Sequence, residues 1–325
     1  MSGQAQKGSS SSATNPRGAG GGTLLLALLP CFALGVFAAG RGLEDAALPG
    51  AHGLAGFTLQ ALLPALLLLG ICLASAAAVT ALFARLTRRP PMEGAATAAF
   101  LFVLTVPLST PVVPAALSLV FGLVVGREVF GTPERSFVHP AVLAHVFLSL
   151  AWPAALDGAA TWLPPDGATD QTWAAWLVLS PVPGTLGAAS ALACLVGGSV
   201  LVVRRLIAWR VAVAVPIGVA VALALLGRTE GLGPSMLALP AHLTLGSLAF
   251  GAAFLAGAAN SSPATSSGRW FHGALVGFLV VLFRQTVDTA PDGTMNAILL
   301  ASVFAPLTDH VVNAWRAEDE RSQRA

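Results

Sequence analysis

The stretch Phe102-Val-Leu-Thr-Val-Pro-Leu-Ser-Thr-Pro111 decides the fold, because it interrupts an apolar run in which one helix would otherwise continue. Pro107 and Pro111 lack a backbone N–H and clash with the preceding helical turn, so they end or kink a helix. The apolar segments on either side, about 95–108 and 112–126, are shorter than the roughly 20 residues that a transmembrane helix needs. We therefore expect broken helices among the spans.

Composition places the 325-residue chain outside the soluble class, because 55% of its residues are hydrophobic and only 10% are charged. Soluble domains carry roughly 25% charged residues. Apolar runs recur from about residue 24 to residue 312, which predicts an all-α polytopic membrane protein in the inner (plasma) membrane, with the lipid bilayer as its surroundings. The net charge of +2 gives no electrostatic case for a nucleic-acid partner.

The three cysteines, Cys31, Cys72 and Cys194, stand in different apolar runs without the spacing of metal ligands or redox pairs. They are interpreted as small packing residues, and no metal site is predicted.

About ten transmembrane helices are predicted, flanked by a disordered tail at 1–22 and a short tail at 314–325. A cleaved signal peptide is the alternative for the first apolar segment, but no small-x-small cleavage site follows it, and a retained span is favoured. The chain then divides into membrane repeat 1 at 23–156, a loop at 157–183 and membrane repeat 2 at 184–313. The spans fall at about 23–40, 57–84, 95–108, 112–126, 139–156, 184–203, 207–227, 239–258, 270–287 and 294–313.

Arginines between the spans indicate the topology, since positive residues are retained on the cytoplasmic side. If the tail at 1–22 is cytoplasmic, the outer loops hold only Arg41 and Arg228 as basic residues. Both termini are therefore predicted in the cytoplasm, and the loop at 157–183 on the outer face. The inner connections and the C-terminal tail hold Arg85, Arg88, Arg89, Arg127, Arg135, Arg204, Arg205, Arg210, Arg269, Arg316, Arg321 and Arg324.

The two halves resemble each other. Phe102–Pro111 parallels Phe254-Leu-Ala-Gly-Ala-Ala-Asn-Ser-Ser-Pro263, and each is followed by a glycine-rich apolar segment. Further on, His139-Pro-Ala-Val-Leu-Ala-His-Val-Phe147 parallels Asn296-Ala-Ile-Leu-Leu-Ala-Ser-Val-Phe304. Five spans per repeat is an odd number, so the halves are predicted to lie inverted, with half-helices meeting inside the membrane as in transporters. Chance similarity between Ala/Leu/Gly-rich segments is the alternative.

Several segments, in order along the chain, resemble one known family, the NqrB/RnfD family. Its members are membrane subunits of the sodium-translocating NADH:quinone reductase (Nqr) and of the Rnf electron-transport complex. The segments are Arg127-Glu-Val-Phe-Gly-Thr-Pro-Glu-Arg-Ser-Phe-Val-His-Pro-Ala-Val-Leu-Ala-His-Val-Phe-Leu148, Pro183-Gly-Thr-Leu-Gly187, Ile207-Ala-Trp-Arg210, His242-Leu-Thr-Leu-Gly-Ser-Leu-Ala-Phe-Gly251 and Ala297-Ile-Leu-Leu-Ala-Ser-Val-Phe-Ala-Pro-Leu-Thr-Asp-His310.

The resemblance implies a subunit of a redox-driven pump for sodium or protons, with other membrane and redox subunits as partners. In the family, a flavin transferase links FMN through a phosphoester to the threonine of a "D-x-x-S-G-A-T" loop. Gly167, Ala168 and Thr169 fall where this motif should be, so the resemblance implies FMN on Thr169. A second, non-covalent flavin is also predicted. The alternative from the residues alone is a turn in which Thr169 or Asp170 caps the following helix.

This chain departs from the family at polar positions. Asp166 stands where the motif has serine and Leu163 where it has aspartate, while His139 and Asn260 replace a family asparagine and aspartate. These departures favour a second hypothesis, a flavin-free structural or transport subunit. His139, Asn260 and Ser261 are candidates for an ion or flavin pathway, and helix capping or local hydrogen bonding is the alternative role for each.

Overall fold

The computed structural model describes residues 16–46, 54–88, 94–131, 138–156, 173–180, 184–226, 239–258, 262–286 and 292–322. In these residues the regular structure is helical, apart from two isolated single-residue β-bridges. The first half contains α1 (Pro16–Ala46), α2 (Leu54–Thr87), α3 (Ala95–Leu104), α4 (Val112–Leu123), η1 (Val124–Val129), α5 (Pro140–Ala151) and η2 (Pro153–Leu156). The second half contains α6 (Trp173–Val178), η4 (Leu186–Ala189), α7 (Ala191–Val203), α8 (Trp209–Leu226), α10 (Leu239–Thr244), α11 (Leu248–Phe250), η6 (Gly251–Ala256), α12 (Ser266–Thr286) and α13 (Thr294–Ser322).

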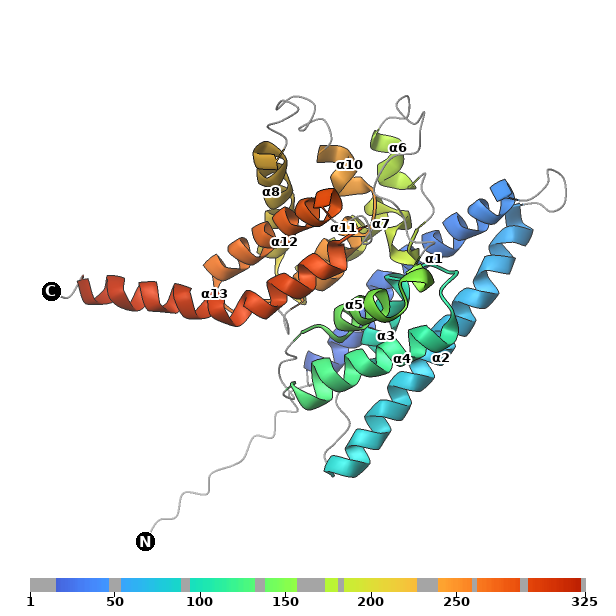
Figure 1. The fold of residues 1–325 in the computed structure, drawn as a ribbon, viewed down its shortest axis with the longest axis horizontal. Coiled ribbons are helices and arrows are strands. Elements are labelled where there is room, and N and C mark those ends of the chain that lie inside the picture. Colours follow the sequence, from blue (N-terminus) through green and yellow to red (C-terminus); the bar gives the residue numbers. More distant parts are fainter. Residues whose placement is uncertain are drawn as a thin grey trace, which may run out of the picture.

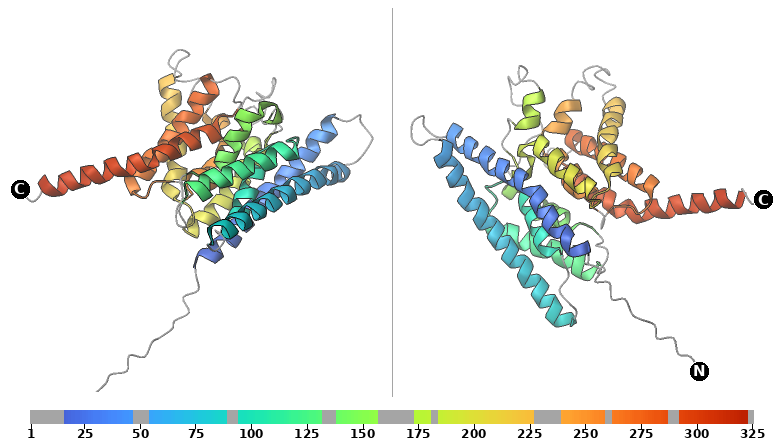
Figure 2. Two further views of the ribbon diagram at one scale, coloured as in Figure 1. Left: turned by 60° about the horizontal axis from the view of Figure 1, so that its bottom comes forward. Right: turned by 180° about the vertical axis from the view of Figure 1, so that it is seen from behind.

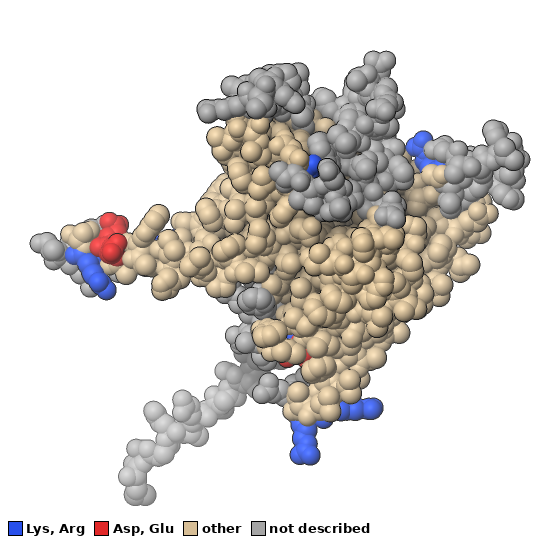
Figure 3. Space-filling view, viewed as in Figure 1, with Lys and Arg blue, Asp and Glu red and all other residues tan. Residues whose placement is uncertain are grey.

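Six helices in the described residues are long and apolar enough to cross a membrane. Their outward faces carry exposed leucine, valine and isoleucine side chains. Figure 3 shows a broad surface without charged groups, with the arginine side chains gathered mostly toward its ends. The prediction of an all-helical polytopic membrane protein is confirmed. The six spans are 21–42, 58–87, 112–129, 209–226, 266–285 and 294–319.

The helices form one bundle with a long antiparallel pair, α1 and α2, along one side (Figure 1). Helix α1 also packs on α7, which joins the two halves, and α4 packs along α5. In the second half α12 lies between α8 and α13, and the C-terminal part of α13 extends away from the bundle in every view (Figure 2). Helix α1 begins at Pro16, before the predicted boundary at residue 23, and α13 continues past residue 313 to Ser322.

Glycine brings α8 and α12 into backbone contact. A Cβ at Gly277 of α12 would meet the carbonyl oxygen of Val215 and, at 2.8 Å, the amide nitrogen of Val219, both on α8. Gly218 of α8 faces the Ala274 backbone of α12 in the same way. Small residues allow this close approach in lipid, where packing rather than the hydrophobic effect drives helix association.

Two predicted breaks are present. Helix α3 ends at Leu104 and α4 begins at Val112, while η6 ends at Ala256 and α12 begins at Ser266. The structure contains a third break that was not predicted. It divides the expected span at 239–258 between α10 and α11, at residues 245–247. Its physical reason is Gly246, whose φ of +73° is the left-handed conformation that glycine adopts readily.

We expect Gly277→Ala to destabilise the protein, because the added methyl group must push α8 and α12 apart. Overpacking of this kind costs about 1–3 kcal/mol. Gly70→Ala on α2 is the matched control, since nothing lies within 4 Å of a Cβ at that position. The measurement is the thermal midpoint of each purified variant in the same detergent. Equal midpoints for the two variants would contradict the proposed helix contact.

Candidate functional site

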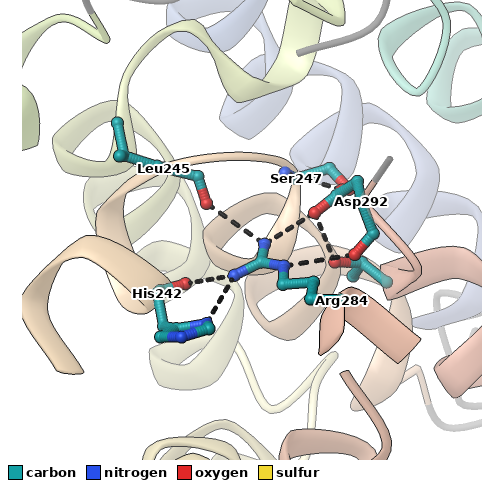
Figure 4. A network of polar contacts seen from close by, with 6 residues as sticks. His242, Leu245, Ser247, Arg284 and Asp292 are labelled. Carbon is teal, nitrogen blue, oxygen red and sulfur yellow. Dashed lines mark hydrogen bonds and ion pairs between the residues drawn. The ribbon is translucent and has the colours of Figure 1, made fainter. Parts of the chain in front are cut away.

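A buried ion pair lies where α10, α11 and the start of α13 meet (Figure 4). The Arg284 side chain, from the end of α12, is 0% exposed, and its Nη2 lies 2.6 Å from Oδ1 of Asp292. The Nε atom of Arg284 donates to the carbonyl oxygen of Asp292 (3.2 Å), and Nη2 also donates to the carbonyl oxygen of Leu245 (3.2 Å). The Nη1 atom donates to the carbonyl oxygen of His242 (2.9 Å) and lies 3.3 Å from its Nδ1. All five N–H donors of the guanidinium therefore have acceptors.

These contacts explain how the chain breaks between α10 and α11. The last carbonyls of a helix lack intrahelical partners, and so do the first N–H groups of the next helix. Arg284 supplies donors to the carbonyls of His242 and Leu245 at the end of α10. Asp292 accepts from the N–H of Ser247, the N-cap of α11, at 2.9 Å, and also from its hydroxyl. Each charge thus faces the helix end whose dipole it complements.

Gly246 packs directly against this ion pair. A Cβ at this position would lie 2.6 Å from Oδ1 of Asp292 and 2.7 Å from Nη2 of Arg284.

Burial would raise the pKa of the Asp292 carboxyl, but the charge of Arg284 and the hydrogen bonds from Ser247 and Arg284 hold that pKa below its ordinary value. The carboxylate is therefore ionised at neutral pH and forms a true ion pair with Arg284.

Asp309 of α13 satisfies the backbone after the second predicted break. Its carboxylate accepts from the N–H groups of Ala264 (2.8 Å) and Thr265 (2.9 Å) and from the Thr265 hydroxyl (2.7 Å). Thr265 in turn accepts from the N–H of Gly268 in the first turn of α12 (3.2 Å). The antiparallel helices α12 and α13 are thus joined by a carboxylate at both ends, Asp292 at one and Asp309 at the other.

Each predicted break is also bridged by an extended residue from the second half. Pro107 pairs with Thr185 just before η4, and Ala258 pairs with Ile207 just before α8. The N–H of Leu186 donates to the carbonyl oxygen of Val106 at 3.3 Å at the first break. At the second break, the N–H of Ala208 donates to the carbonyl oxygen of Gly257 at 3.1 Å. The bridges supply hydrogen-bond partners that proline and the broken helices lack.

Two histidines in the stretch after the first break have distinct positions. His139 is the N-cap of α5, where its Nδ1 accepts from the N–H of Ala141 at 3.3 Å. This is the capping role that the sequence left as the alternative for His139. His145 Nδ1 lies 3.2 Å from the hydroxyl of Thr105, the C-cap of α3. The hydroxyl already donates to Phe102 (2.7 Å), so the imidazole must be the donor to Thr105.

Sequence reasoning missed His272, on α12 beside the second break. Its side chain is buried, and neither ring nitrogen makes a hydrogen bond within the described residues. The backbone oxygens of Ala256, at the end of η6, and Ala301, on α13, lie beside the ring. The signal was present, since an ionisable residue inside an apolar span is a functional candidate by default. At the first break the hydroxyl of Thr185 is also buried without a partner in the described residues.

The remaining predicted site residues lie outside the described residues. Gly167, Ala168 and Thr169 belong to the segment between η2 and α6, and Asn260 and Ser261 belong to the second break. The structure therefore does not test a flavin position. Within the described residues no group of three His, Cys, Asp or Glu side chains could hold a metal ion.

Comparison with known proteins matches the model of the NQR2, RnfD, RnfE family to residues 21–317, nearly the whole chain. The chain belongs to this family. It is 37% identical over 251 residues to the NqrB subunit of the Na(+)-translocating NADH-quinone reductase of Pseudomonas aeruginosa strain LESB58, which covers 71% of the chain and 62% of the relative. The corresponding protein of Neisseria meningitidis strain MC58 is 36% identical over 255 residues, with the same coverage. The chain thus spans about three fifths of the length of the curated relatives it matches.

In this family member we expect Arg284→Gln to be strongly destabilising, because it leaves Asp292 partly buried without its cation. Breaking a buried pair by removing one partner costs about 3–5 kcal/mol. Arg85→Gln, at an exposed position on α2, is the control and should leave the thermal midpoint near the wild-type value. An Arg284→Gln variant that melts like the control would show that the ion pair does not hold the α10–α11 break.

Proposed function

We propose that the chain is the integral membrane subunit of an Nqr/Rnf-type, redox-driven ion-translocating electron-transport complex. The family match over residues 21–317 carries this proposal, together with the NqrB relatives from the Na(+)-translocating NADH-quinone reductase. The described residues form a helical bundle, so oxidation of the electron donor belongs to partner subunits. The other membrane and redox subunits of the complex are its proposed partners.

The flavin belongs to this proposal as well. The hydroxyl of Thr169 would hold the phosphate of FMN after transfer by a flavin transferase, and Gly167 and Ala168 would leave that hydroxyl accessible. Bound FMN would supply electron transfer at the outer face. The order of the motif matches supports this assignment, and a second, non-covalent flavin stays a prediction.

A flavin-free family member is the second candidate function. Asp166 and Leu163 favour it, since both depart from the family motif around Thr169. A carboxylate next to the acceptor repels a phosphate-bearing donor by about 1 kcal/mol at close contact in water. In that case the chain would serve the complex as a structural or transport subunit.

We place the two halves as inverted five-helix repeats with about ten spans. Three parallels support this arrangement: a single-residue bridge ties each predicted break, a glycine-containing helix follows each break, and that helix packs on the last helix of its half. The arginine distribution supports cytoplasmic termini. Under this topology the segment with Thr169 faces outward, and Asp309 lies toward the cytoplasm.

The ion pathway is assigned to the two predicted breaks. Each has an imidazole next to the last helical residues before it, His145 at Thr105 and His272 beside Ala256. The buried hydroxyl of Thr185 faces the first break without a described partner. An imidazole can relay a proton between its two ring nitrogens, and backbone oxygens at broken helices bind cations. His139, as the α5 N-cap, orients the half-helix that carries His145, while Asn260 and Ser261 remain candidates at the second break.

Flavin attachment is tested by Thr169→Ala in protein produced with its native flavin transferase. We expect wild-type protein to give a fluorescent band in a denaturing gel, and Thr169→Ala to give none. Thr172→Ala, in the same segment, is the control and should stay fluorescent. Mass spectrometry of the peptide that contains Thr169 should find the added FMN. An unmodified wild-type peptide would leave the family assignment intact and favour the flavin-free subunit.

The ion pathway is tested in vesicles that contain the complete complex. We expect His145→Phe and His272→Phe to lower the rate of ion uptake by roughly a hundredfold, the low end of what a positioned proton-transfer group contributes to a rate. His310→Phe, exposed on α13, is the control. Wild-type uptake in both test variants, with the thermal midpoint unchanged, would remove the histidines from the pathway.

A further inference from the structure

An apolar groove separates α7 from α8 and is closed from behind by α10, α11 and η6. Its volume is about 670 Å³. Leu195 and Val213 at its edges are 56% and 47% exposed, so the groove opens onto the surface that faces lipid. In the first half α1 and α2 pack together, whereas α7 and α8 leave this space between them. Its floor and walls include Cys194, Gly198, Val202, Pro216, Ala249 and Ala252.

The groove has the size of a ligand pocket, since its volume of about 670 Å³ falls within the roughly 300–1,000 Å³ that such pockets enclose. The groove follows α7, which is about 20 Å long at 1.5 Å per residue. This length is comparable to one leaflet of the hydrocarbon core, which is about 15 Å thick. An acyl chain matches both the length and the apolar walls.

One mouth of the groove is basic. The lining residues Val202 and Val203 end α7 and are followed by Arg204 and Arg205, both exposed, and Trp209 begins α8. Arg210 stacks over the ring of Trp209, with Cζ 5.0 Å from the ring centroid. None of the three guanidinium groups forms an ion pair within the described residues. Tryptophan and arginine together mark the membrane interface, where lipid phosphates lie.

Arg205 occupies a position that would favour glycine. The N–H of Leu206 donates to Leu201 (2.9 Å) and that of Arg205 to Val202 (2.9 Å), which closes α7 as a Schellman motif. Arg205 therefore has φ +58°, a conformation that is uncommon for side chains other than glycine. The side chain of Arg205 thus places a positive charge beside the groove, at a position where glycine would be less strained.

We propose that this groove is a binding site for one anionic phospholipid. An acyl chain lies between α7 and α8, and the phosphate lies against Arg204, Arg205 and Arg210. Basic pockets between transmembrane helices bind anionic headgroups in this manner. The inference uses neither the flavin nor the ion pathway, so its failure would leave the proposed function untouched.

The test is native mass spectrometry of the delipidated full-length protein, titrated with phosphatidylglycerol or with phosphatidylcholine of the same acyl chains. We expect one tightly bound phosphatidylglycerol and weaker binding of phosphatidylcholine. Arg204→Gln with Arg205→Gln should weaken phosphatidylglycerol binding about 25-fold, or about fivefold per arginine, from the usual effect of a basic residue at an anionic surface. Ser199→Trp, which fills the groove from α7, should abolish the tight site for both lipids.

The matched control is Arg85→Gln with Arg88→Gln, a pair of exposed arginines at the end of α2, where Arg88 also has a positive φ. This variant should bind phosphatidylglycerol like the wild type. Equal binding of the two lipids, an unaffected Arg204/Arg205 variant, or an equal loss in the control would overturn the proposal. So would a photo-crosslinker at position 199 that labels a partner subunit instead of lipid in the complete complex.

Discussion

The rest of the structure depends on one constraint: backbone groups at helix ends inside an apolar bundle must find partners without water. The described residues contain three such interruptions: one is resolved by an ion pair and the other two by backbone bridges, one of them together with a carboxylate. The α10–α11 break uses the Arg284–Asp292 pair, the end of the second predicted break uses Asp309, and both predicted breaks use a single-residue bridge. Each of these partners is distant in sequence from its break, and the Pro107–Thr185 bridge at the first break also joins the two halves of the chain.

Close helix packing makes these long-range partners available. Gly277 and Gly218 bring α12 against α8, which fixes the end of α12 near α10 and places Arg284 at the carbonyls it caps. The same glycines leave no room for adjustment, because the facing atoms belong to backbone rather than to flexible side chains. Packing and capping therefore depend on each other: a wider α8–α12 spacing would also withdraw the cation from Leu245 and leave Asp292 unpaired.

The sequence predicts what is local and misses what is long-range. Pro107 and Pro111 predict the first break. The position of His139 directly before Pro140 is typical of a helix N-cap. The third break is hidden, because Gly246 lies in an apolar run and its supports, Arg284 and Asp292, lie about 40 residues away. His272 is visible as an ionisable residue, but only the fold places it beside Ala256 and Ala301. The segment with Thr169 lies outside the described residues, so its flavin remains a prediction from resemblance.

The contrast between the breaks bears on where ions could pass. At the α10–α11 break every donor of Arg284 is engaged and Asp292 has several donors, so moving either charge would leave another unpaired. The α10–α11 break is therefore suited to a structural role rather than to ion exchange. Each of the two predicted breaks has a buried polar group without a partner in the described residues, the hydroxyl of Thr185 at one and the imidazole of His272 at the other. A buried hydroxyl or imidazole without a partner has a lone pair available, so it can coordinate a cation that arrives at the break. The ion pathway is therefore proposed at these two breaks rather than at the Arg284–Asp292 pair.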